Sequence, residues 1–422
     1  MMNPLRTSLS QLRSRALRYL SKPSVTVRLY SVKEEPDYYQ PGGFHRVHLG
    51  DTYNNGQYTI LRKLGYGQYS TVWLARDSER QRYVALKILR ADCYSGSGGS
   101  KNIFEREILL KISEVSRQSL HQGSKYVSHV LEQFTHSGPN GDHVCFAFDV
   151  LGHHLDFQTA KFEDGRLPVR AVRVIARQLL LALDFLHGEV GVVHTDLKPT
   201  NILLELENPN RTISQHLSNV PVRTDSQHED ATPLREVIPM PLVLEKRDIH
   251  IRIIDFGVAS WRNRHLSELI QSPALRAPEV TIGAPWDTGV DIWSLGCIIV
   301  ELVQGFVLFS GEASQKGTWT AEDDHLARIT EVLGNLPLEF IRKGKRAGHF
   351  FDEKGNLRRI PYLKPTSLKC LLDGETKPFL RPADMPKTEF PVFIDFIRSM
   401  LEIDPASRKS AAELLRHEWV RL

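Results

Sequence analysis

The sequence predicts an α+β protein of two lobes, a small β-rich lobe followed by a larger and mainly helical one. Segments rich in β-branched and aromatic residues at 58–74 and 84–87 are strand-like, whereas the apolar segments around 179–187 and 298–300 are helix-like. A chain of 422 residues is also long for a single hydrophobic core. The hydrophobic content of 41% and the charged content of 25% are typical of a soluble globular protein.

The composition argues against several classes of protein. No apolar run reaches the roughly 18 residues that a membrane-spanning helix needs. The four cysteines, Cys93, Cys145, Cys297 and Cys370, lack metal-binding spacing and indicate reduced thiols inside the cell. The net charge of +4 indicates no class of partner, and we expect no direct binding of nucleic acid.

The first 33 residues differ in kind from the rest. Residues 1–33 contain arginine and lysine but no acidic residue, and their leucines lie mostly on one helical face before Pro23. Two interpretations stay open: a mitochondrial transit peptide cleaved near Ser31, or a basic tail with another use. Residues 34–57 are predicted to be a linker and an extension of the first lobe.

The first lobe, predicted over 58–148, begins with a glycine-containing hairpin. Gly65 and Gly67 let the backbone turn tightly, so the loop between the two strands can lie over phosphate groups. The next apolar strand ends in Lys87, whose burial would be costly without a negative partner such as a phosphate.

A helix beginning near residue 104 is expected to hold Lys87 through a glutamate. At 100° per residue, Glu105 lies nearer to the apolar face of this helix than Glu107 does. We therefore favour Glu105 as the partner and keep Glu107 as the alternative. The strand at 144–149 then leads into a hinge at 149–152 and a second lobe at 153–422.

The stretch 192–204 is predicted to be the chemical centre of the protein. Apolar triplets at its two ends indicate short buried strands that hold a polar loop between them. In that loop Asp196 can accept a hydroxyl proton, Lys198 can neutralise phosphate charge and Asn201 can ligate a metal ion. These are the groups that phosphoryl transfer requires.

A second strand of this lobe is also followed directly by a polar residue. The strand at 251–254 ends in Asp255, a second candidate metal ligand, followed by Phe256 and Gly257. Before it, residues 208–241 have low hydrophobicity and no clear period. We expect an exposed insertion there, with disorder as one interpretation, and not a separate domain.

Two further interactions are predicted within the second lobe. Glu279, in the sequence Ala-Pro-Glu, is expected to form an ion pair with Arg408. Asp291, at the start of an apolar helix, is expected to accept hydrogen bonds from the backbone of the polar loop.

Taken in order, these elements resemble those of a eukaryotic protein kinase over 38–422, and several resemble the SR-protein kinase family. The resembling stretches are 42–45, 50–51, 63–67, 70–74, 150–155 and 194–196. The resemblance implies a bilobal protein-kinase fold, with ATP and Mg²⁺ as cofactors. It also implies transfer of the γ-phosphate to serine and threonine hydroxyls of protein substrates rich in arginine and serine.

The resemblance also implies which residues meet the nucleotide. They lie on the glycine hairpin, the Lys87 strand and the hinge: Leu64, Gly65, Tyr66, Gly67, Gln68, Tyr69, Ser70, Val72, Ala85, Lys87, Phe148, Asp149 and Leu151. Asp196, Lys198, Lys87 and Glu105 or Glu107 would serve catalysis, and Asn201 and Asp255 would bind the metal ion.

An acidic docking helix in that family maps onto 323–331. Asp324 and Glu331 keep the matching positions, seven apart and so on one helical face, as candidate substrate-docking residues. Arg328 lies between them at helical spacing, where it can neutralise the acidic groove.

The catalytic loop also bears on regulation. Thr195 stands where many kinases have an arginine that pairs with a phosphate on the activation segment. We therefore expect the segment 255–279 to need no phosphate. Trp261, Leu266, Leu269 and Ile270 are the predicted apolar anchors, whereas Ser260, Ser267 and Ser272 remain candidate phosphorylation sites.

Two other functions stay as alternatives to an active protein kinase. One is a pseudokinase or scaffold, which would use the fold only for binding; no loss of Lys87, Asp196, Asn201 or Asp255 supports it. The other is a kinase of small molecules, which the intact Ala-Pro-Glu sequence and the large second lobe disfavour. We expect a monomer in the cytoplasm or nucleus, with the mitochondrion as the alternative set by residues 1–33.

Overall fold

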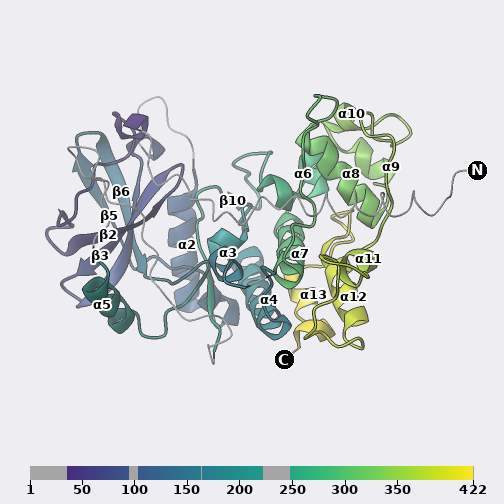
Figure 1. Cartoon of the computed structure of the whole chain (residues 1–422). Helices are drawn as coiled ribbons and strands as arrows, with labels where there is room; N and C mark the ends of the chain where they lie inside the picture. Colours follow the sequence, from purple (N-terminus) through teal and green to yellow (C-terminus); the bar gives the residue numbers. More distant parts are fainter. Residues whose placement is uncertain (1–35, 95–102, 163, 222–247, 422) are drawn as a thin grey trace, which may run out of the picture.

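The structure is a computed structural model that describes residues 36–94, 103–162, 164–221 and 248–421. An antiparallel sheet forms one end of the molecule and a group of helices forms the other, so the predicted two lobes are present (Figure 1). The predicted N-terminal segment 1–33 lies outside the described residues.

The sheet of the first lobe has six strands in the order β1-β2-β3-β4-β6-β5. They are β1 (Thr52–Tyr53), β2 (Tyr58–Tyr66), β3 (Ser70–Asp77), β4 (Arg82–Leu89), β5 (Glu132–Gly138) and β6 (Gly141–Asp149). Alternation along β4 sends Val84, Leu86 and Ile88 into a cluster on one face of the sheet. Ala85 and Lys87 consequently face the opposite side, toward the cleft.

The extension before the sheet belongs to the first lobe. Phe44 is buried, and the Asn140 side chain on the β5–β6 turn donates hydrogen bonds to the carbonyls of Tyr39 (3.1 Å) and Phe44 (2.7 Å). Residues 42 and 43 also bond the short turn that follows β4, because the N–H groups of Asp92 and Ala91 donate to the carbonyls of Gly42 and Gly43. The part of 34–57 that is described is therefore packed structure.

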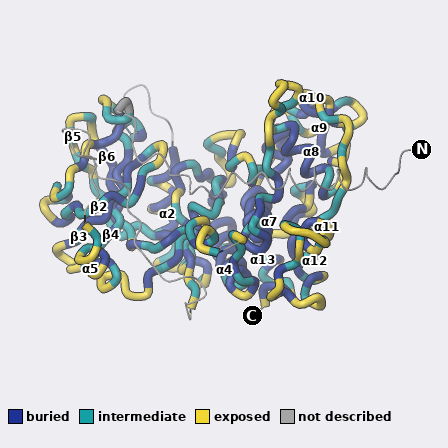
Figure 2. Tube along the Cα trace, in the orientation of Figure 1, coloured by how far each residue is buried: buried dark blue, intermediate teal, exposed yellow. Residues whose placement is uncertain are grey.

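The helices of the second lobe surround α7 (Gly289–Gln304), which is buried along nearly its whole length (Figure 2). The others are α3 (Leu155–Thr159), α4 (Val169–Asp184), α6 (Pro278–Ile282), α8 (Ala321–Leu333), α9 (Leu338–Arg342), α10 (Ala347–Phe350), α11 (Leu368–Leu372), α12 (Phe390–Met400) and α13 (Ala411–Leu414). No helix among the described residues is long and apolar enough to cross a membrane.

Short strands frame the predicted chemical centre. β7 (Val192–Val193) precedes the polar loop and β8 (Ile202–Leu204) follows it. β7 pairs with β10 (Ser260–Trp261), and β8 pairs with β9 (Ile251–Ile253), which ends just before Asp255. This pairing brings the polar loop and Asp255 to one place.

The prediction for 208–241 was wrong in its first part. Residues 209–219 form helix α5 (Pro209–Asn219), which packs on the sheet of the first lobe (Figure 1). Ile213 and His216 are buried at this contact, and Asn210 accepts a hydrogen bond from the Tyr83 backbone on β4 (3.2 Å). The sequence pattern did not reveal this helix because it has two large apolar residues, Ile213 and Leu217, which are too few to show a clear helical period. Residues 222–247 lie outside the described part of the chain.

Candidate active site

A cleft of about 510 Å³ lies between the two lobes. Every residue predicted to meet the nucleotide lines it, from Leu64 on the glycine hairpin to Leu151 in the hinge. Asp196, Lys198, Asn201, Glu105 and Asp255 line it as well. The cleft therefore joins the chemical groups of both lobes.

Of the two candidate glutamates, Glu105 contacts Lys87. It is the first residue of α2 (Glu105–Gln118) and forms a buried ion pair with the Lys87 ammonium, whereas Glu107 is exposed. Lys87 Nζ also lies 3.1 Å from Asp255 Oδ1. Burial opposes the charge on Lys87, but the nearby carboxylates of Asp255 and Glu105 outweigh it and raise the pKa of this lysine. Lys87 is therefore held charged and aimed into the cleft.

The groups of the catalytic loop lie within hydrogen-bonding reach of one another. Lys198 Nζ is 2.5 Å from Asp196 Oδ2, and the Asn201 amide donates to Asp196 O (2.9 Å). The hydroxyl of Ser272, in the activation segment, donates to Asp196 Oδ1 (3.0 Å). Asp196 thus has a fixed orientation and its carboxylate faces the cleft, as a base for an incoming hydroxyl must.

The backbone of the loop is fixed from below by Asp291. Its carboxylate accepts hydrogen bonds from the backbone N–H of His194 (2.8 Å) and Thr195 (2.9 Å) and from the His187 ring (2.9 Å), which confirms the predicted contact. Thr195 has a φ of 67°, a left-handed conformation that costs free energy in a non-glycine residue. The two bonds to Asp291 help to hold that conformation next to Asp196.

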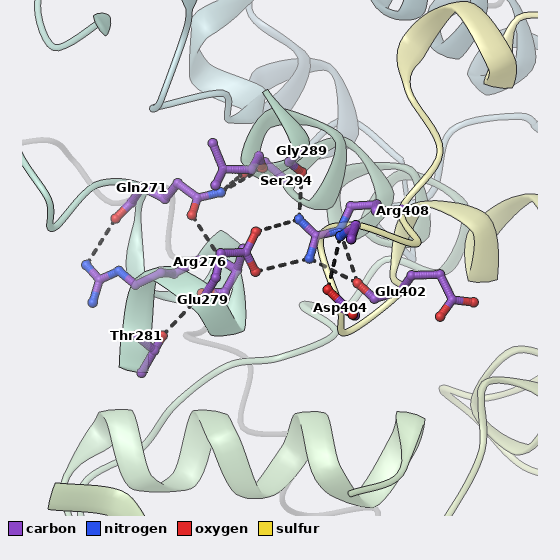
Figure 3. Close-up of polar contacts among 12 residues, drawn as sticks. Gln271, Arg276, Glu279, Thr281, Gly289, Ser294, Glu402, Asp404 and Arg408 are labelled. Atoms are coloured by element: carbon purple, nitrogen blue, oxygen red, sulfur yellow. Dashed lines mark hydrogen bonds and ion pairs between the residues drawn. The ribbon is translucent and has the colours of Figure 1, made fainter. Parts of the chain in front are cut away.

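The predicted pair between Glu279 and Arg408 is present and fully buried. Arg408 donates from both terminal nitrogens to the two carboxylate oxygens, at 2.6 and 3.0 Å, and also to the Gly289 carbonyl (Figure 3). Beside it, the Gln271 side chain donates to the Ser294 hydroxyl (2.8 Å) and accepts from the Ala277 N–H (3.0 Å). These bonds fix the end of the activation segment on α7.

The activation segment is held mostly as predicted, with one exception. Trp261 and Leu266 pack against the hydrophobic core and Ile270 is buried in it, but Leu269 is 52% exposed and is not an anchor. Three of the four predicted anchors therefore contact the core. The Thr195 hydroxyl donates to the Val258 carbonyl (2.8 Å), so the residue that replaces arginine bonds this segment directly.

The predicted docking residues do not form an open acidic groove. Asp324 is buried, and its carboxylate accepts from Arg328 Nε (2.8 Å) and from the Glu312 N–H (3.0 Å). Glu331 accepts from the Lys364 N–H (2.6 Å). The i,i+4 spacing brings Arg328 onto Asp324, so both carboxylates already have partners within the protein.

The residues of the cleft fit a nucleotide and a divalent metal ion. Asp255 and Asn201 supply oxygen atoms of the type that Mg²⁺ prefers, and the Asp255 side chain is 47% exposed toward the cleft. A Cβ added at Gly67 would meet no atom within 4 Å, so the hairpin leaves open space beside its backbone. Lys87 supplies a fixed positive charge for phosphate groups.

Comparison with known proteins agrees with this geometry. The family model of the protein kinase domain matches residues 58–420. The chain is 31% identical to protein kinase dsk1 of Schizosaccharomyces pombe, over 94% of this chain and 87% of that protein. It is 32% identical to serine/threonine-protein kinase SRPK of Physarum polycephalum, over 92% of each, and 27% identical to human SRSF protein kinase 3, over 92% and 90%.

The fold and the site define a protein kinase, an enzyme that transfers phosphate to serine and threonine residues of proteins. Within that class, the chain belongs to the SR-protein kinase family. The pseudokinase alternative is not favoured, because the relatives are named as kinases and the cleft keeps its catalytic groups.

Two residues of the site escaped the sequence reasoning. Ser272 was considered only as a phosphorylation site, and nothing in the sequence places its hydroxyl on Asp196, 76 residues away. No sequence pattern indicated that the Arg264 guanidinium would lie over the Phe104 ring. Both contacts form only when the activation segment folds back onto the cleft.

Proposed function

We propose that this kinase phosphorylates serine residues in proteins rich in arginine and serine, and that it uses ATP with Mg²⁺. The observation that carries the proposal is the site built around Asp196, in a chain that aligns over more than nine-tenths of its length with kinases named SRPK and SRSF protein kinase.

The residues of this chain have separate parts in the reaction. Asp196 would accept the proton of the substrate hydroxyl, and Lys198, 2.5 Å away, would neutralise charge on the transferred phosphoryl group. Lys87, held by Glu105, would position the phosphates of ATP. Asp255 and Asn201 would hold Mg²⁺, which when bound neutralises negative charge on phosphate oxygens.

The test is an assay of the purified chain with radiolabelled ATP under three conditions. The substrate is an Arg-Ser peptide, a basic control protein without Arg-Ser sequence, or absent. We expect incorporation into the Arg-Ser peptide at a kcat/KM at least tenfold above the control protein. Equal incorporation into both would overturn the substrate class but not the kinase activity. The Asp196→Asn variant gives the background.

We also propose that the enzyme acts as a monomer and that residues 1–33 decide its location. The absence of acidic residues in that segment supports import into mitochondria. The cytoplasm and nucleus are the alternative that the resemblance to SR-protein kinases implies. A reporter fused to residues 1–30 distinguishes the two, because a transit peptide carries the reporter into mitochondria and a basic tail does not.

A further inference from the structure

Arg264 makes a contact that crosses between the two lobes. Its guanidinium carbon lies 4.8 Å from the centre of the Phe104 ring, within the range of a cation–π interaction. Arg264 belongs to the activation segment of the second lobe. Phe104 directly precedes α2 in the first lobe and is buried in the hydrophobic core. The contact therefore ties the activation segment to the start of α2.

The start of α2 is where the catalytic ion pair is made. Glu105 is the first residue of the helix, directly after Phe104, and its partner Lys87 also bonds Asp255. A shift of Phe104 would move the Glu105 backbone with it. On the preceding side, residues 95–102 lie outside the described part of the chain, and Tyr94 accepts a hydrogen bond from the Arg106 N–H (2.7 Å).

The positive charge of Arg264 lies near the N-terminus of α2. A cation near a helix N-terminus is disfavoured by the helix dipole, so an arginine there needs a compensating interaction. The face of the Phe104 ring supplies it, and the first turn of α2 carries the acidic residues Glu105 and Glu107. Within the described residues no ion pair involving Arg264 is found, and the side chain is otherwise exposed.

The residues on either side of Arg264 are fixed to the second lobe. Arg262 donates to both carboxylate oxygens of Asp287 (3.1 and 2.6 Å). The His265 ring stacks on Trp286, with ring centres 3.6 Å apart and an interplanar angle of 10°. Arg264 thus extends from a well-anchored base and can transmit the position of the activation segment to α2.

We propose that Arg264 is a positioning residue, which holds Phe104 and the start of α2 so that Glu105 stays on Lys87. Through this contact an unphosphorylated activation segment couples directly to the catalytic ion pair. The contact uses a side chain of the segment itself in place of an added phosphate.

The test measures kcat and KM of the full chain with one peptide substrate for Arg264→Ala, Arg264→Lys, Phe104→Leu and the double variant Arg264→Ala/Phe104→Leu. Arg264→Ala should lower kcat two- to five-fold, equivalent to ~0.5–1 kcal/mol, with the peptide KM unchanged. Arg264→Lys should recover most of the loss, because lysine also binds a ring face. The double variant should lose no more than the Phe104→Leu variant loses.

The matched control is Arg76→Ala. The Arg76 guanidinium lies over the Tyr83 ring at the same 4.8 Å, but on the sheet and away from α2. This control should keep the parental kcat, and thermal melting should show that every variant is folded. A kcat within 1.5-fold of the parent for Arg264→Ala, or losses from the two single variants that add fully in the double variant, would overturn the proposal.

Discussion

At the scale of single residues, the neighbours of Asp196 orient its carboxylate, and a different group of residues binds the nucleotide. Its two carboxylate oxygens face Lys198 and Ser272, and Asn201 donates to its backbone carbonyl. Lys87 and Asp255 form a separate group on the phosphate side of the cleft. Catalysis and nucleotide binding should therefore respond separately to substitution.

The first prediction separates these two functions. Asp196→Asn should abolish phosphate transfer and leave ATP affinity within a few-fold of the parent, because the amide cannot accept the hydroxyl proton but leaves Lys87 and Asp255 in place. Calorimetric titration with ATP and the radiolabel assay measure the two quantities. Retained turnover in this variant would reject Asp196 as the base.

The second prediction concerns the closed acidic helix. Arg328→Leu should remove the partner of Asp324. The KM for an Arg-rich peptide should fall at least three-fold, because Arg328 no longer neutralises the Asp324 carboxylate. The free energy of unfolding should fall by ~3 kcal/mol, because a buried carboxylate loses its ion pair. Arg398→Leu removes an exposed arginine elsewhere on the second lobe and serves as the control. An unchanged KM would show that this helix does not contact substrate.

At the scale of elements, the activation segment is fixed by protein contacts at both ends. Thr195 bonds it near Val258, and Gln271 bonds its other end to α7. Ser260 is buried and accepts from the Leu266 N–H (2.9 Å). Of the three candidate phosphorylation sites, only Ser267 is exposed.

The third prediction is that this segment needs no phosphate. Phosphatase-treated protein and the Ser267→Ala variant should both keep near-full activity. Ser272→Ala should lose at least tenfold in kcat, because a hydrogen bond to the charged Asp196 is worth ~1.5–3 kcal/mol. A tenfold loss after phosphatase treatment or in Ser267→Ala would show control by phosphate. The Ser272 variant separates that effect from loss of the Asp196 contact.

The fourth prediction concerns α5, which leaves the second lobe and packs on the first. The Tyr83 hydroxyl lies 3.0 Å from the Ser214 hydroxyl, and Arg62 donates to the Val220 carbonyl (3.2 Å). Ile213 is fully buried, so Ile213→Ala should lower the free energy of unfolding by ~2–4 kcal/mol. Denaturant unfolding measures it, with exposed Gln215→Ala on the same helix as the control. Equal effects would mean that α5 contributes no packing.

At the scale of the whole molecule, the N-terminal extension sets a pH dependence of stability. Burial, with the neighbouring His143 and His136 rings, lowers the pKa of His45 to about 4, and His48 acts in the same direction while Asp51 opposes it. The native state therefore takes up this proton later than the unfolded state does as the pH falls. Stability from this group is complete above pH ~6.5 and is lost as the pH falls toward 4.

The fifth prediction follows from this loss of stability as the pH falls. The melting temperature should fall between pH 7.5 and pH 5, and His45→Gln should flatten the curve, because glutamine takes up no proton. Thermal melting across this range measures both proteins. Parallel curves for the two would show that His45 does not contribute to the pH dependence.

Much of the site could be predicted from local sequence. The apolar triplet before Asp196 and the strand-like segment before Asp255 place these two groups just after short strands, where their side chains leave the core. The predicted strand end at Lys87 was wrong, because β4 continues to Leu89 and it is the alternation along the strand that directs Lys87 to the cleft. The helical period of 100° per residue also distinguished Glu105 from Glu107. Period and strand ends are properties of a short segment, so the sequence determines them by itself.

Other features were decided only by the tertiary structure. The Ser272 hydroxyl reaches Asp196, Arg264 lies over Phe104, and α5 packs beside Tyr83, in each case between segments far apart in the chain. The i,i+4 spacing of Asp324 and Arg328 was visible in the sequence, but their burial depends on the segments packed around α8. A local pattern shows which face of an element is apolar, whereas the partner of that face depends on how the whole chain packs.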